Sequence, residues 1–424
     1  MTVLLVVVLP ALLLAMGVPI FVVLLAAALG GIVLSGNPIQ ALHSAMFGNL
    51  DIFPLLAVPL FIYAGDIMSR GGIARRLIEL ILSLVGAVRG ALGIATIAAC
   101  EVFSVMSGSS VACVAAIGKL TIPSLKKNGY GDTFSVSLVT ATGVIDVITP
   151  PSITMIIYGI AAQQSVPQLF LAGFPAGILI GIALAIYVVW YARVENIPIT
   201  APAQRKHIIA HLKDSIWSLL APIVILGGIY GGIFTPTEAA GVACIYAIVV
   251  SMFIYRELTW RELWSITVES SALIAQILII VGAAGAFAWL ITTSGFPGKL
   301  VAFVDHMGLQ TWMLLLVINI ILLFVGSVLE PPAAILLLTP LLTPIVYQAG
   351  INPIHFGIIF TVNLAIGMFM PPFGLNLFAS HALFGTPLPK LYRGVLPFLV
   401  IYLLMLLLIT YVPAITLVPL RLLW

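Results

Sequence analysis

Apolar residues run along almost the whole chain. A helix needs about 20 apolar residues to cross the hydrocarbon core of a bilayer, so the pattern predicts about ten to twelve membrane elements. Two runs, 77–118 and 312–347, are too long for one crossing and too interrupted by Gly and Pro for one straight helix, so each is expected to hold a helix and a re-entrant hairpin. The apolar runs are 3–34, 52–68, 77–118, 133–162, 169–191, 217–255, 263–291, 312–347, 354–385 and 395–422.

The composition agrees with a membrane protein. Of the 424 residues, 62% are hydrophobic and 7% are charged, whereas a soluble domain carries about 25% charged residues. The net charge is +3, and no basic patch is large enough to indicate a nucleic-acid partner. The three cysteines lie in apolar stretches without CxxC spacing, which argues against a disulfide or a zinc site. The chain is therefore predicted to be an all-α polytopic membrane protein.

Proline, glycine and threonine positions of the first half of the chain recur in the second half at one constant spacing. The matching positions are Pro123 with Pro344, Gly129 with Gly350, Thr140 with Thr361, and Pro150-Pro151 with Pro371-Pro372. After one inserted residue, Pro167 and Pro175 match Pro389 and Pro397. An ordered series of this kind indicates an internal duplication.

The distribution of basic residues indicates that the two copies are inverted. Lys126 and Lys127 follow the first hairpin candidate, but no Lys or Arg lies between 300 and 389. One crossing later the bias reverses, because Lys390 stands where the first copy has Gln168. Positively charged loops mark the cytoplasmic side of a membrane, so equivalent loops of the two copies are predicted to face opposite sides.

Each copy contains a helix break. The segments Gly143–Ser152 and Gly367–Gly374 both place a Pro-Pro pair inside an apolar run. Paired prolines remove two backbone donors, and the freed carbonyls are tolerated in a membrane only inside protein or beside a wet cavity. Carbonyl oxygens turned outwards are ligands suited to Na⁺. We therefore predict cation binding at both breaks.

Small polar segments upstream of the breaks are expected to complete these sites. Ser107-Gly108-Ser109-Ser110 separates two apolar runs, as the tip of a re-entrant hairpin requires, and Gly326–Pro332 is its counterpart. Hydroxyls and carbonyls at such tips are expected to coordinate a cation, and the exposed helix N-termini are expected to hold an anionic substrate.

Acidic residues inside apolar runs are candidates for function, because a charge inside a membrane is costly. Asp146 is expected to bind Na⁺ or to carry a proton, and Glu330 is expected to contact a cation or substrate hydroxyls. Glu101 and Glu238 are expected to cap a helix or to pair with an Arg near an interface.

These segments together resemble the large membrane subunit of tripartite ATP-independent periplasmic (TRAP) transporters over essentially the whole chain. The residues that carry the resemblance are Ser107-Gly108-Ser109, residues 115–118, Ile148–Ser152, Glu330, Ala333-Ala334, Pro340, Pro344, His355-Phe356-Gly357 and Ile366-Gly367 before Pro371-Pro372. The resemblance implies an inverted-repeat, elevator-type secondary transporter, in which a transport domain carries substrate and Na⁺ past a fixed scaffold. It also implies a multi-pass protein of the bacterial inner membrane that imports an organic acid, of the sialic acid, C4-dicarboxylate or sugar acid type.

The same resemblance implies partners and sites. A small membrane subunit enlarges the scaffold, and a periplasmic substrate-binding protein delivers the organic acid. At least two Na⁺ sites are implied: site 1 with Ser107, Ser109 and the carbonyls of Asp146, Thr149 and Pro151, and site 2 with Gly326, Gly367, Met370 and Phe373. The implied substrate contacts are Ser109, Thr154 and Glu330. Asp146 departs from the family, which usually has Gly there, so the nature of the ion at site 1 stays open.

The resemblance also divides the chain into segments. The expected segments are N-terminal scaffold helices at 1–76, a first repeat of arm, hairpin, broken helix and scaffold helix at 77–191, a polar cytoplasmic linker at 192–216, scaffold and arm helices at 217–291, and a second repeat of hairpin, broken helix and C-terminal helix at 292–424.

Two other functions agree with parts of the sequence. A proton-coupled organic anion transporter would use Asp146 as the proton carrier. An intramembrane aspartyl protease is suggested by Gly129-Tyr130-Gly131-Asp132, which matches a GxGD string, but the preceding Lys126-Lys127-Asn128 places this Asp in a turn at an interface. No HExxH or GxSxG string occurs, so we expect no enzyme activity.

Overall fold

The computed structural model describes residues 4–84, 86, 88–199 and 205–423, and all regular secondary structure in these residues is helical. Seven helices in this part of the chain are long and apolar enough to cross a membrane, or up to nine if each bent pair is one crossing. The predicted all-α membrane fold is therefore confirmed. The number of long helices is smaller than ten to twelve because turns divide several apolar runs; Gly17, for example, separates α1 (Leu9–Ala15) from α2 (Ile20–Ser35).

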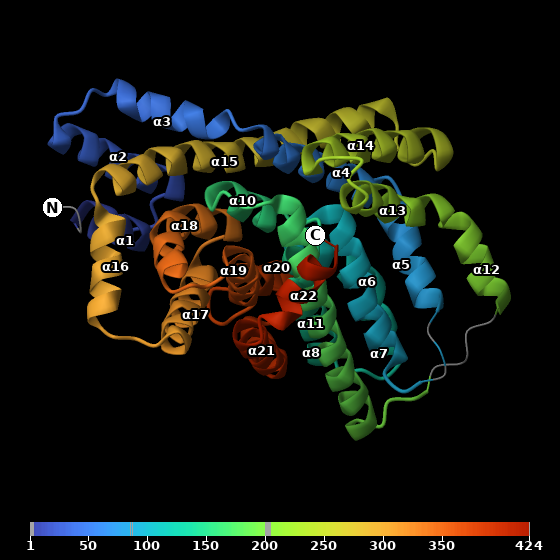
Figure 1. Cartoon of the computed structure of the whole chain (residues 1–424). Helices are drawn as coiled ribbons and strands as arrows, with labels where there is room; N and C mark the ends of the chain where they lie inside the picture. Colours follow the sequence, from blue (N-terminus) through green and yellow to red (C-terminus); the bar gives the residue numbers. More distant parts are fainter. Residues whose placement is uncertain (1–3, 85, 87, 200–204, 424) are drawn as a thin grey trace.

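One layer of the molecule is built around the long helix α15 (Trp260–Thr293). Its 34 residues correspond to a length of about 50 Å, and Figure 1 shows it crossing the molecule above most of the other helices. It packs against α2, α3 (Gln40–Leu50) and α4 (Ala57–Arg70), and α4 packs against α14 (Pro236–Val249). The predicted scaffold segments 1–76 and 217–291 therefore meet in this layer.

Helices from both halves of the chain pack together beneath this layer (Figure 1). The first half supplies α6 (Ala91–Ser107), α7 (Ser110–Lys127), α8 (Asp132–Thr142), α9 (Ile145–Ile148), α10 (Ile153–Ala161) and α11 (Val166–Val194). The second half supplies α17 (Thr311–Val328), α18 (Pro331–Gln348), α19 (Pro353–Gly367), α20 (Leu375–Phe384) and α21 (Leu388–Tyr411). The halves interdigitate, because α8 packs on α21, α10 on α18, α11 on α19 and α7 on α20.

The remaining elements lie at the ends and the connections. They are η1 (Leu4–Val8), η2 (Phe53–Leu56), α5 (Ile73–Ser83), α12 (Arg205–Asp214), α13 (Ile216–Tyr230), η3 (Val250–Ile254), α16 (Phe296–His306) and α22 (Ala414–Leu423). The predicted linker 192–216 thus contains α12, and its residues 200–204 lie outside the described residues. Arg76 of α5 binds Asp214 at the end of α12 (Nε–Oδ2, 3.1 Å) and Glu257 (Nη1–Oε1, 2.6 Å), so the end of the linker is held against α5.

The helix boundaries follow the duplication. α7 and α18 each have 18 residues, and their first residues, Ser110 and Pro331, are separated by the same spacing as Pro123 and Pro344. The starts of α8 and α19 are separated by this spacing too, and the starts of α11 and α21 by one residue more, as the inserted residue requires. The peptide bonds Pro150–Pro151 and Pro371–Pro372 are both cis. Equivalent helices therefore begin at equivalent positions of the two copies.

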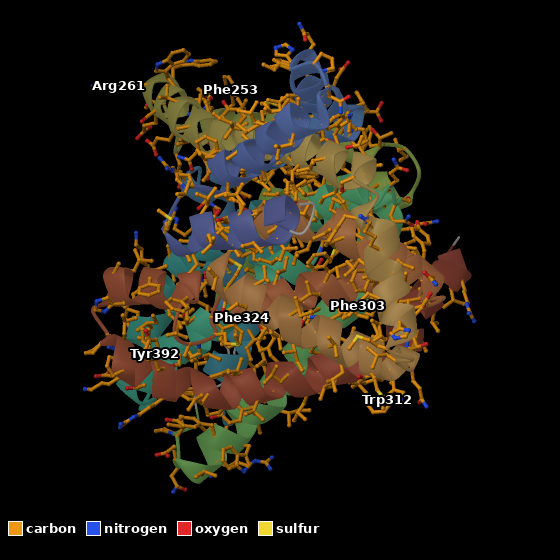
Figure 2. All side chains as sticks on the ribbon, turned by 90° about the vertical axis from the view of Figure 1, so that its left-hand side faces the viewer. Phe253, Arg261, Phe303, Trp312, Phe324 and Tyr392 are labelled. Carbon is orange, nitrogen blue, oxygen red and sulfur yellow. The ribbon has the colours of Figure 1, made fainter. Side chains whose placement is uncertain are left out.

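Large apolar side chains lie on the outer surface. Figure 2 shows Phe303, Trp312 and Phe324 at the face formed by α16 and α17, and their side chains are 60%, 47% and 69% exposed. Apolar groups on this scale at the surface of a monomer indicate contact with lipid or another protein, which agrees with a membrane-embedded chain.

The predicted inversion is tested by two matched positions, Lys127 and Gln348, the last residues of α7 and α18. We expect Lys127→Cys to react with a membrane-impermeant maleimide only from the cytoplasmic side and Gln348→Cys only from the periplasmic side, because lysine-rich loops face the cytoplasm. The measurement compares intact cells with inverted membrane vesicles, and the three buried native cysteines serve as the unreactive background. Labelling of both variants from the same side would show that the copies are parallel.

Candidate functional site

The tip of the first hairpin is a two-residue turn between α6 and α7. α6 ends at Ser107, and Gly108 adopts a left-handed conformation with a φ of 61°, which favours glycine. Ser109 is the N-cap of α7, and its Oγ accepts a hydrogen bond from the backbone NH of Ala112 at 3.5 Å. Ser109 itself is exposed, so the second residue of this turn is accessible.

The hairpin tip meets the first helix break through Ser107 and Asp146. The Oγ of Ser107 donates to Oδ1 of Asp146 at 3.2 Å. The Asp146 side chain is fully buried, and its Oδ2 has no hydrogen-bond partner among the described residues. A buried carboxylate oxygen without a partner is costly, so this atom fits a bound cation or proton. Two residues predicted for site 1 are thus in direct contact.

The backbone of the first break leaves carbonyl groups without helical donors. Pro150 and Pro151 occupy the positions that would donate to the carbonyls of Asp146 and Val147 in a continuous helix. The Oγ of Ser152 donates to the Val147 carbonyl at 2.5 Å and also accepts from the NH of Met155 at 3.4 Å, as the N-cap of α10. The Asp146 carbonyl is left without its usual donor, beside the carboxylate of the same residue.

Glu101 is a residue of this region whose role the sequence did not indicate. The expectation that it caps a helix or pairs with an Arg is wrong, because its Oε2 accepts a hydrogen bond from Oγ1 of Thr149 at 2.8 Å. Its Oε1 is buried and has no partner among the described residues. In the sequence, the one sign of a role for Glu101 was its position as an acidic residue inside the apolar stretch 91–106. Glu238, in contrast, forms the expected cap, as part of a capping box with Thr235.

The second break is held by direct backbone contact between α17 and α19. A Cβ on Gly367 would lie 2.6 Å from the backbone nitrogen of Ser327 and even closer to the carbonyl group of Gly326. The freed carbonyls of this break find backbone partners, because the NH of Met370 donates to Gly367 at 3.2 Å and the NH of Asn376 donates to Met368 at 2.8 Å. Two residues predicted for site 2, Gly326 and Gly367, therefore touch.

A hydrogen bond across the halves of the chain joins two residues that lie next to the predicted sites. The Oγ of Ser110, next to the first hairpin tip, donates to Oδ1 of Asn376 at 3.1 Å. Ser110 is buried, and Nδ2 of Asn376 is buried without a partner in the described part of the chain. The first hairpin therefore contacts the second break as well as its own.

The other predicted site residues occupy different environments. Thr154 is 5% exposed and Thr149 3% exposed, whereas Phe373 is 60% exposed. Pro151 is buried, Met370 is half-buried, and Glu330 is exposed at the N-terminus of α18. Within the described residues no hydrogen bond joins Glu330 to Ser109 or Thr154, so these contacts with substrate remain predictions.

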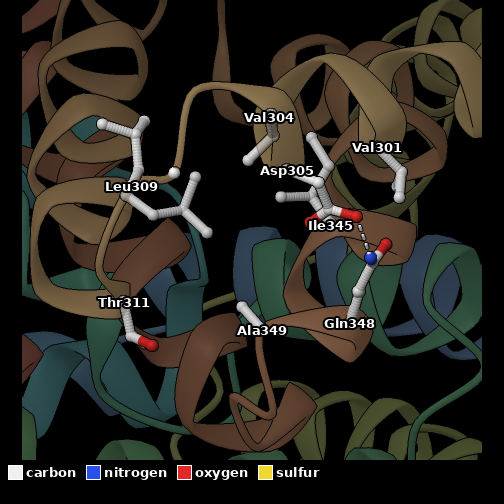
Figure 3. Close-up of a pocket in the computed structure, with 10 residues that line it drawn as sticks. Val301, Val304, Asp305, Leu309, Thr311, Ile345, Gln348 and Ala349 are labelled. Carbon is white, nitrogen blue, oxygen red and sulfur yellow. Dashed lines mark hydrogen bonds between the residues drawn. The ribbon is translucent and has the colours of Figure 1, made fainter.

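Two hollows lie away from the predicted sites. A cavity of about 140 Å³ between α16, α17 and α18 is bordered by Asp305, which accepts a hydrogen bond from Gln348 (Figure 3). A second cavity, of about 560 Å³, lies between η2, the connection from α10 to α11, and the start of α14. No predicted site residue lines either of these two cavities.

The structure places Asp132 of the GxGD string at the surface. Its side chain is 79% exposed and pairs with Lys126 of α7 (Oδ1–Nζ, 3.2 Å) across the turn that leads into α8. An exposed carboxylate at the start of a helix does not form a buried catalytic pair, so the geometry offers no support for the protease alternative.

Comparison with known proteins identifies relatives over nearly the whole chain. The family model "Tripartite ATP-independent periplasmic transporter, DctM component" matches residues 6–415. The C4-dicarboxylate TRAP transporter large permease protein DctM of Pseudomonas aeruginosa is 41% identical over 393 residues, which cover 93% of this chain and 92% of that protein. The isethionate TRAP transporter permease protein DctMQ of Oleidesulfovibrio alaskensis is 40% identical over 407 residues, 96% of this chain and 64% of that protein.

A solved structure supports the fold. The crystal structure of the Alcanivorax borkumensis YdaH transporter superposes with a TM-score of 0.68 over 89% of each chain. The two sequences are 14% identical in this alignment, so the similarity shows a shared fold only.

The backbone contact at the second break predicts that adding one methyl group at Gly367 lowers the stability of the protein. We expect Gly367→Ala to destabilise the protein by about 1–3 kcal/mol, because the new Cβ meets backbone atoms that cannot move aside as a flexible side chain does. Gly241→Ala in α14 is the matched control, since nothing lies within 4 Å of its Cβ and Ala favours a helix by about 1 kcal/mol over Gly. Thermal unfolding of the purified variants measures both changes, and equal melting temperatures would contradict the contact.

Proposed function

The chain belongs to the DctM family of tripartite ATP-independent periplasmic transporters, and from this membership we propose that it imports an organic acid by Na⁺-coupled secondary transport. The chain is a multi-pass large permease subunit, and the relatives named above are transporter permeases rather than enzymes. The coupling ion, the substrate and the partners are the parts that we propose.

One observation carries the Na⁺ proposal: the Ser107–Asp146 contact at a helix break. It brings a hydroxyl, a buried carboxylate with one unpartnered oxygen and a carbonyl without its helical donor into one place. Oxygen donors of this kind suit Na⁺, which transporters bind at unwound helix segments. The Ser107 and Ser109 side chains, Asp146 and the carbonyls of Thr149 and Pro151 would form site 1.

The second ion would bind mainly to backbone. Gly326 and Gly367 allow α17 and α19 to touch, and carbonyls near this contact, with Met370 and Phe373, would form site 2. The Ser110–Asn376 hydrogen bond gives a physical route by which an ion at one break stabilises the other.

The substrate is proposed to be an organic anion. The two relatives are named for C4-dicarboxylates and for isethionate, and both compounds carry an acidic group. The exposed residues Ser109 and Glu330 are the N-caps of α7 and α18, and a helix N-terminus favours negative charge. We propose that Ser109, Thr154 and Glu330 contact this anion, with Glu330 accepting from substrate hydroxyls.

The family supports two protein partners and an elevator mechanism. A periplasmic binding protein would deliver the substrate at the inner membrane of a bacterium, and a small membrane subunit would extend the layer around α15. This chain covers 64% of the relative named DctMQ, a length that is consistent with a second subunit joined to the permease. The hairpins and breaks would move as one body past the α4–α14–α15 layer.

Na⁺ binding is tested by thermal unfolding in NaCl against KCl at constant ionic strength. We expect a saturable, Na⁺-specific rise in melting temperature, because a ligand that binds only the folded state stabilises it by mass action. Asp146→Asn keeps the side-chain size but removes the charge, and we expect a loss of about tenfold or more in apparent Na⁺ affinity. A wild-type protein that responds equally to both salts, with uptake driven by a pH gradient, would replace Na⁺ by H⁺ as the coupling ion.

Uptake by the complete transporter tests the substrate contacts. With its two partners in liposomes, we expect the Ser109→Ala and Glu330→Ala variants to lose at least about 90% of organic-anion uptake, since the lost contacts leave polar substrate groups unpaired. The Na⁺-dependent melting shift of Glu330→Ala should remain, because Glu330 lies outside both proposed Na⁺ sites. Wild-type uptake in both variants would remove these residues from the substrate site.

A further inference from the structure

Glu101 lies where α6, the first break and α11 meet. Its Oε2 accepts from the Thr149 hydroxyl at 2.8 Å, and Oε1 is buried without a partner among the described residues. The carbonyls of Thr149 and of Pro151, two residues later in the chain, are proposed ligands of site 1. Glu101 therefore contacts a residue of the proposed ion site from an element other than the hairpin tip.

α11 makes room for this carboxylate with two glycines. A Cβ on Gly181 would lie 2.6 Å from Oε1 of Glu101, and a Cβ on Gly177 would lie 3.6 Å from Oε2 and much closer to the Thr149 hydroxyl. Residues four apart lie on one face of a helix, so both glycines face the same side chain. Any larger residue at either position would displace Glu101 or Thr149.

The second copy of the duplication lacks this polar group entirely. At the equivalent positions of the repeat, Leu322, Met370, Leu399 and Leu403 stand where the first copy has Glu101, Thr149, Gly177 and Gly181. Leu322 is fully buried in α17. The duplicated architecture therefore forms without a carboxylate at this place, and the Glu–Thr–Gly–Gly set is particular to the first copy.

We propose that Glu101 is a positioning residue for site 1. By accepting the Thr149 hydroxyl it fixes the orientation of the peptide groups that follow. When the carboxylate is ionised, it also attracts a cation at the break, since charges interact strongly in a medium of low dielectric constant. In this proposal Glu101 acts through Thr149 and is not itself a ligand of the ion. The inference rests on the proposed Na⁺ coupling and adds a supporting shell to it, of the kind that orients ligands at metal sites.

The test is the apparent Na⁺ dissociation constant of the purified full chain, from the melting temperature in NaCl–KCl mixtures of constant ionic strength. Glu101→Leu introduces the residue of the second copy, Thr149→Val removes the donor, and Glu101→Gln keeps an acceptor but removes the charge. We expect about a tenfold or larger rise in the Na⁺ dissociation constant for Glu101→Leu and for Thr149→Val, and a smaller rise for Glu101→Gln. Thr149→Ser restores the hydroxyl and should restore the wild-type value, and Glu238→Gln is the matched control at an exposed cap.

The outcomes separate this inference from the Na⁺ proposal. A wild-type protein without a Na⁺-specific response overturns both. If Glu101→Leu, Thr149→Val and Glu101→Gln all keep the Na⁺ dissociation constant of the wild type, the inference alone is overturned. The inference is also overturned if these variants melt at a lower temperature in KCl but keep the wild-type Na⁺ dependence, because that result indicates a purely structural role. If Glu101→Leu does not fold, the comparison of Thr149→Val with Thr149→Ser tests the inference. Only a positioning role predicts weaker Na⁺ binding without the hydroxyl at position 149 and normal Na⁺ binding with it.

Discussion

Backbone groups freed by the two proline pairs set the main constraint on this structure. A membrane offers no water to a carbonyl that has lost its helical donor, so each break survives only where other groups surround it. Each half of the chain therefore brings a helical hairpin to its break: Ser107 contacts Asp146 in the first half, and Gly326 contacts Gly367 in the second. The packing of the helices beneath the α15 layer follows from this requirement.

The two copies solve the same problem with different chemistry. In the first, side chains take part, because Ser152 binds the Val147 carbonyl and Asp146 adds a carboxylate. In the second, the freed carbonyls of Gly367 and Met368 bind backbone NH groups. A duplicated chain thus has one break rich in side-chain oxygens and one formed mostly by backbone, so the proposed ion sites are expected to differ in affinity.

Much of the fold was predictable from sequence because proline and glycine act locally. The Pro-Pro pairs, the Gly108 turn and the repeated spacing mark the breaks, the hairpin tip and the duplication without knowledge of packing. The Glu101–Thr149 and Ser110–Asn376 hydrogen bonds were not predictable, since they join segments 48 and 266 residues apart and depend on how helices face one another. The lengths of the helices were not predictable either, because hydropathy does not show where a turn divides an apolar run.

The Ser110–Asn376 hydrogen bond has a consequence for the history of the chain. A gene duplication first produces two identical halves that are free to diverge. A side-chain contact between the halves then limits which substitutions each half tolerates at the contacting position. The donor lies in the first half and its acceptor in the second, at positions that are not equivalent in the repeat. If the two halves came from distant relatives, the side chains at these two positions would no longer form a matched donor and acceptor. Recombination within this gene is therefore expected to keep the two halves together.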